Sequence, residues 1–221
     1  MNEVILFRPS TRSTLSPVLF IFLITLGSFG CHSSHPHQDE LDELRSLESS
    51  VLGAFAQVQN LPTDSVLASA RWASQNLQEL ELLLSGNRIE ITKAEGAIIS
   101  EVSRARRLLK DHATRRNRLS KNTERTQLQI KLLADAIAQH ARFDGAGTAI
   151  DSSYIAQQLK TETRVANELI AALLETVDLA HRGMNLVEGA RSDNDSLQKV
   201  LRARLAQFIL EDSNESTLQD P

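Results

Sequence analysis

The chain has 221 residues, which is enough for one domain with a substantial core or for two small ones. Its formal net charge of −4 comes from 24 basic and 28 acidic residues, so the total charge does not call for a polyanionic partner. Aromatic residues make up only 4% of the chain, and a core of Leu, Ile, Val and Ala is typical of helix bundles. The sequence contains no G-x-S-x-G, H-E-x-x-H, glycine-rich phosphate loop or C-x-x-C motif. We therefore expect neither an enzyme nor a bound cofactor.

Residues 1–30 have the layout of a secretory signal peptide. Arg8 and Arg12 precede an apolar run over residues 18–26, and small residues follow that run. The run is shorter than the roughly 20 apolar residues that a membrane-spanning helix needs. The sequence therefore predicts that the chain is exported.

The segment LGSFGC, residues 26–31, resembles a bacterial lipobox, in which a signal peptidase cuts before a cysteine that is then lipidated. Gly30 suits the position before the cut, whereas Ser28 stands where the usual pattern has an aliphatic residue. The resemblance implies that Cys31 is the first residue of the mature protein and carries a lipid that anchors it in the cell envelope, at the outer membrane, facing the periplasm or the cell exterior. An ordinary signal peptide cut near Gly30 and an uncleaved anchor are the alternatives. Because Cys31 is the only cysteine, lipidation would also remove an otherwise exposed free thiol.

Three histidines follow the cysteine, at His32, His35 and His37. Imidazoles this close together are weak candidates for binding copper, nickel or zinc. A lipidated cysteine is a poor ligand, so we interpret residues 31–37 as a flexible tether and expect no metal site.

The mature chain has the period of α-helices from residue 38 to residue 210, and we expect one helical bundle domain there with a disordered tail at 211–221. No proline lies between Pro62 and Pro221, which permits long helices. The expected helices cover residues 38–59, 64–85, 92–142, 153–187 and 197–210.

Each expected helix has an apolar seam. In the second, Val66, Ala73 and Leu77 belong to a heptad pattern, and the third opens with a capping box at Thr92 and Glu95. The seam of the fourth includes a charged residue, Glu162.

These patterns predict an all-α fold, an elongated antiparallel helical bundle with coiled-coil-like packing and one long central helix. That central helix is the one expected over residues 92–142, about 75 Å long at 1.5 Å per residue. A homo-oligomer in which the seams meet between chains is the alternative.

A basic stretch lies within the expected central helix. Two acids, Asp111 and Glu124, oppose nine basic residues there, which gives a local charge of +7. The nine are Arg104, Arg106, Arg107, Lys110, Arg115, Arg116, Arg118, Lys121 and Arg125. We expect these side chains either to pair with acids on neighbouring helices, such as Glu79, Glu81, Glu162 or Glu168, or to contact an anionic partner. Nucleic acid is not expected, because the stretch has no interleaved aromatic residues for base stacking.

The segments TQLQIKLLADAIAQ, residues 126–139, and YIAQQLKTETRVANELIAALLETV, residues 154–177, resemble small helical lipoproteins of Bacteroidetes-type bacteria. Such families generally have no known function, so the resemblance implies a location and a helical fold alone. We expect a non-enzymatic, lipid-anchored envelope protein that acts as a helical spacer or protein-interaction module. The alternatives are a periplasmic holdase-like chaperone and an adaptor that binds an anionic envelope polymer through residues 104–125. We expect the partner to be another envelope protein or an anionic envelope polymer.

Overall fold

The computed structural model of the chain describes residues 36–85 and 89–217, with side chains described as far as residue 211. The described residues belong to one compact unit, which is assigned to residues 35–221. This unit contains all the described helices and all their hydrophobic clusters. The proposed signal peptide, Cys31, His32 and His35 lie outside the described residues.

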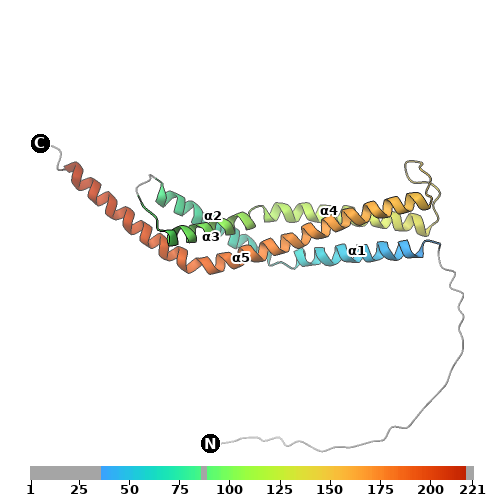
Figure 1. The fold of residues 1–221 in the computed structure, drawn as a ribbon, viewed down its shortest axis with the longest axis horizontal. Helices are drawn as coiled ribbons and strands as arrows, with labels where there is room; N and C mark the ends of the chain where they lie inside the picture. The colour runs from blue at the N-terminus through green and yellow to red at the C-terminus, as the bar shows by residue number, and fades with distance from the viewer. Residues whose placement is uncertain (1–35, 86–88, 218–221) are drawn as a thin grey trace, which may run out of the picture. The chain divides into compact units, whose positions relative to one another are not determined.

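The described part of the chain is an all-α bundle, as the sequence predicts (Figure 1). Its helices are α1 (Gln38–Gln59), α2 (Thr63–Leu84), α3 (Lys93–Leu109), α4 (His112–Ala138) and α5 (Ser152–Thr217). The first two match the expected bounds to within one residue. The capping box at the start of α3 is also confirmed, because the Thr92 side chain accepts from the Glu95 backbone N–H and the Glu95 side chain accepts from the Thr92 N–H.

The long helix expected over residues 92–142 is wrong. The chain breaks after Leu109, where Asp111 has φ 61° and ψ 6°, a left-handed conformation that ends α3 and starts α4. Aspartate adopts this conformation more readily than most residues, so the break needs neither glycine nor proline.

The long helix of the fold is instead α5, which has 66 residues and a contour length of about 100 Å. It runs without interruption through the two helices expected at 153–187 and 197–210, and Figure 1 shows that it bends in its C-terminal part. The tail expected to be disordered from residue 211 is helical as far as Thr217, and residues 218–221 lie outside the described part.

Two three-helix sections share α5, which packs against all four other helices. The first section buries residues of α1, α4 and the N-terminal half of α5, including Leu44, Ile130 and Leu173. The second buries residues of α2, α3 and the C-terminal half of α5, including Leu80 and Leu201. The predicted seams are therefore buried within one chain.

The break between α1 and α2 lies beside the break between α3 and α4, and we call this level the joint. Leu61, just before α2, packs in the same cluster as Leu109, the last residue of α3. The guanidinium of Arg116, near the start of α4, donates a hydrogen bond to the hydroxyl of Thr63, the first residue of α2. On α5, Gly183 faces Leu109 so closely that no side chain would fit between them. Of the helices described, α5 is thus the one that continues across the joint.

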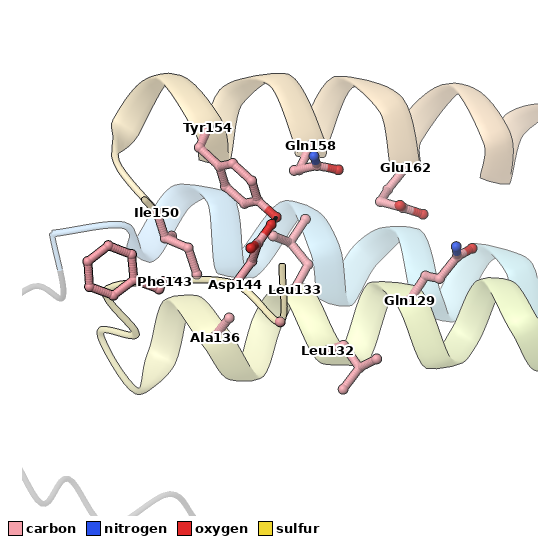
Figure 2. A pocket seen from close by; sticks show the side chains of 11 residues that line it. Gln129, Leu132, Leu133, Ala136, Phe143, Asp144, Ile150, Tyr154, Gln158 and Glu162 are labelled. Carbon is pink, nitrogen blue, oxygen red and sulfur yellow. Dashed lines mark hydrogen bonds between the residues drawn. The ribbon is translucent and has the colours of Figure 1, made fainter. Parts of the chain in front are cut away.

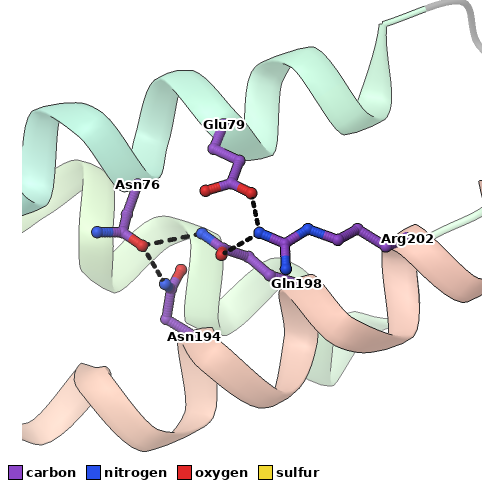
Figure 3. A network of polar contacts seen from close by, with 5 residues as sticks. All are labelled: Asn76, Glu79, Asn194, Gln198 and Arg202. Atoms are coloured by element: carbon purple, nitrogen blue, oxygen red, sulfur yellow. Dashed lines mark hydrogen bonds and ion pairs between the residues drawn. The ribbon is translucent and has the colours of Figure 1, made fainter.

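A polar network holds the C-terminal half of α5 against α2 (Figure 3). The side-chain oxygen of Asn76 accepts hydrogen bonds from the amides of Asn194 at 2.7 Å and Gln198 at 2.9 Å, and Arg202 pairs with Glu79. Asn194 and Gln198 are buried, and Asn194 lies in the gap between the helices expected at 153–187 and 197–210. The hydrogen bonds that the Asn194 and Gln198 NH2 groups donate to Asn76 lower the cost of burying them, although the Oδ1 of Asn194 has no described partner.

Candidate functional site

The nine basic residues of the predicted site do not form one helical face, because the joint divides them between α3 and α4. Seven are exposed, and Arg115 and Arg116 are half-buried at the start of α4. A Nη1 atom of Arg115 is buried without a hydrogen-bond partner among the described residues. The prediction that these side chains lie on one continuous helix is therefore wrong.

The expected pairing of this stretch with nearby acids is wrong. Glu79 pairs with Arg202, and Glu168 pairs with Arg164 at 2.8 Å. Among the described residues, Lys110 alone of the nine has a carboxylate within 4.0 Å, that of the adjacent Asp111. The other eight form no ion pair with the described residues.

His112 is a buried titratable residue at the joint. Its side chain is 3% exposed, and its Nε2 has no hydrogen-bond partner in the described part of the chain. Burial lowers the pKa of His112 below its usual value of 6.5, and the charges of Arg116 and Arg115 lower it further. His112 is therefore neutral in the folded protein near pH 7.

A cavity of about 450 Å³ lies between the C-terminal half of α4, the loop at residues 139–151 and the start of α5 (Figure 2). Much of its wall is apolar, formed by Leu132, Leu133, Ala136, Phe143 and Ile150. Two of these wall residues are unusually accessible, since Leu132 is 58% exposed and Phe143 is 63% exposed. The polar part of the wall comes from Gln129, Asp144, Tyr154, Gln158 and Glu162.

Asp144 organises the loop and is fully engaged in doing so. Its Oδ1 accepts hydrogen bonds from the backbone N–H groups of Ala146 at 2.9 Å and Thr148 at 2.8 Å, and its Oδ2 accepts one from the Tyr154 hydroxyl at 3.1 Å. The Thr148 backbone N–H, with those other donors, lowers the pKa of Asp144. Gly147, at φ 84°, supplies the left-handed residue that the turn requires.

Glu162 supplies the second carboxyl group of the cavity, and its hydrogen bonding differs from that of Asp144. It projects from α5 toward α4 (Figure 2), and its Oε2 is buried without a hydrogen-bond partner in the described structure. Burial raises its pKa above the usual value of 4.5. The sequence did not predict this cavity, although a charged residue in the apolar seam of a helix was the signal that could have found it.

A second hollow, of about 310 Å³, continues the cavity along the groove between α4 and α5. It shares Gln129 with the first and extends to Leu119 and Ala172. Together the two hollows form one open groove between α4 and α5 on a face of the first section.

Of the weak metal candidates, only His37 lies within the described residues, where its Nδ1 is 3.2 Å from the Oε1 of Glu40. No group of three His, Cys, Asp or Glu side chains in the described ranges is placed to hold a metal ion. None of the described helices is long and apolar enough to cross a membrane.

A scan of protein-family models and searches of curated proteins and solved structures each found no match to this chain.

Proposed function

We propose that the chain is a lipid-anchored protein of the bacterial cell envelope that acts as a helical spacer or protein-interaction module rather than as an enzyme. The structural observation that carries this proposal is α5, a single helix of 66 residues on which two separate three-helix sections pack in series. A small domain needs no helix of about 100 Å to bury its core. A protein that bridges a distance, or presents a surface at a distance, does need a helix of that length.

The proposed anchor is close to the first helix in sequence. Only residues 32–37 separate Cys31 from the start of α1 at Gln38, and a chain of that length spans at most about 25 Å. Lipidation of Cys31 would therefore hold the N-terminal end of α1 near the membrane surface. The lipid chains would supply the membrane affinity, since two or more acyl chains anchor firmly where one does not.

Metabolic labelling tests the anchor. Cells that express the full chain are fed an alkyne-tagged palmitate, and the chain is purified and scored for the tag. We expect strong labelling of the wild type and of a Ser34→Ala control, and none of Cys31→Ser. Equal labelling of the wild type and Cys31→Ser would refute the lipid anchor.

One observation favours a second candidate, an adaptor that binds an anionic envelope polymer. The exposed basic residues of α3 and α4 lack the acidic partners that a purely structural role would give them, so they retain their charge for a polyanion. Such binding is electrostatic and falls with added salt.

Retention on a heparin column along a salt gradient tests this candidate. The variant Arg104→Gln/Arg106→Gln/Arg107→Gln should elute at clearly lower salt than the wild type. The control Arg45→Gln/Arg164→Gln/Arg182→Gln removes the same charge from arginines that pair with acids on their own helices, and it should elute close to the wild type. Equal shifts in the two variants would show a response to net charge alone and would exclude the adaptor role.

A further inference from the structure

Among the residues that line the cavity between α4 and α5, Glu162 alone has a buried polar atom without a described hydrogen-bond partner. The carboxylate of Asp144 already accepts three hydrogen bonds, from two backbone N–H groups and the Tyr154 hydroxyl. Glu162 has a buried oxygen that accepts nothing from the described part of the chain. A buried carboxyl oxygen without a donor carries a desolvation cost that a bound donor would recover.

The walls around Glu162 define what else a ligand must satisfy. Leu132, Ala136 and Phe143 come from two different segments and line the same space, so an apolar body placed there would lose its contact with water. The volume of about 450 Å³ lies within the range of about 300–1,000 Å³ that is usual for small-molecule sites. An open, largely apolar cavity with a partly buried acid in its wall fits a molecule that is apolar along most of its length and positive at one end.

We propose that this cavity binds a small organic amine with an apolar or aromatic body, and that the ammonium group of the ligand pairs with the carboxylate of Glu162, which lines the cavity. The body lies against Leu132, Ala136 and Phe143. A longer ligand can extend past Gln129 into the adjoining hollow between α4 and α5. This inference does not depend on the lipid anchor or on the basic residues of the joint.

A matched pair of probes tests the charge requirement. Tryptamine and tryptophol share an indole ring and a two-carbon arm, and they differ in whether the arm ends in an ammonium or a hydroxyl group. Each is titrated at pH 7 into the unit of residues 35–221, which contains the entire described core, and binding is followed by two-dimensional amide NMR. We expect tryptamine to bind about tenfold or more tightly than tryptophol, since a hydrogen bond to a charged group is that much stronger. The shifted amides should be those around Glu162 and the loop at residues 139–151.

Three variants locate the effect. Glu162→Gln should remove the preference for tryptamine, while Glu175→Gln, an exposed acid on the same helix, should keep it. Ala136→Trp should fill the cavity and weaken both probes. The amide spectrum and the melting temperature of each variant show whether its fold is intact.

The proposal is overturned if neither probe binds the wild type at millimolar concentration or if the wild type binds both equally. A preference for tryptamine that survives in a folded Glu162→Gln variant would also overturn it, since the recognising group would then lie elsewhere.

Discussion

Replacing Gly183 by alanine tests how tightly the joint is packed. A Cβ at this position would lie 2.5 Å from both Cγ and Cδ2 of Leu109, and Leu109 is only 1% exposed, so it has no free space into which to turn. Overpacking of this kind costs about 1–3 kcal/mol. The substitution also gains about 1 kcal/mol of helix propensity. At Gly189 on the same helix, an added Cβ would meet no neighbouring atom within 4 Å, so Gly189→Ala gains the propensity without the clash.

Chemical denaturation of residues 35–221, followed by circular dichroism, gives the free energy of unfolding of each variant. We expect Gly189→Ala to be more stable than the wild type by about 1 kcal/mol and Gly183→Ala to be less stable than Gly189→Ala by about 1–3 kcal/mol. Adding Leu109→Ala should make the Gly183→Ala change favourable, because the clash is then removed. If the two single variants were equally stable, the close packing at the joint would be refuted.

Three further substitutions probe other features. The folded protein keeps the pKa of His112 below its unfolded value of 6.5, so stability should fall as the pH drops below that value; His112→Leu should abolish this loss, and unchanged pH dependence of the melting temperature would contradict it. Asn76→Ala should destabilise the fold by about 1–3 kcal/mol, because the buried amides of Asn194 and Gln198 lose their acceptor; a cost near zero in urea denaturation would mean that water replaces it. Thr92→Ala removes the capping box of α3 and should cost about 1 kcal/mol, measured in the same way; no cost would show that the cap contributes nothing to stability.

Periodicity predicted which residues form the core, because burial depends mainly on helical phase. Val66, Ala73 and Leu77 are buried as their heptad spacing indicates. Thr92 and Glu95 could be identified because a capping box depends only on residues within one turn. These features are local, and the sequence contains all the information that they need.

The two errors in the helix assignment have tertiary causes. The break at Asp111 lacks glycine and proline, and it lies where Leu109 packs against Gly183, a residue far away in the sequence. The polar run around Asn194 looked like a loop because its partner, Asn76, belongs to another helix. Neither contact can be read from a local sequence pattern, and in both places tertiary packing overrides the local helix propensity.

The candidate site shows the same division. The basic residues were visible as a run of charge, but their division across the joint was not. The cavity needed the fold, because its wall combines Gln129, Phe143 and Glu162 from three consecutive segments whose approach the loop determines. The one sign of the cavity in the sequence was Glu162, a charged residue in an otherwise apolar helical seam.

Three helices lie side by side in each section of this protein. Two of the three end at the joint, so the bundle is less stiff at the joint than within either section. Helices that are packed side by side resist bending far more strongly together than one does alone. Of the described helices, α5 alone is continuous across the joint and resists bending at that level. A lateral load on one section would therefore bend the protein mainly at the joint. Each section would keep its own core while the angle between them changed, as in hinge motions between rigid bodies. The coincidence of the two breaks thus makes the joint the level at which the described bundle has the fewest continuous helices.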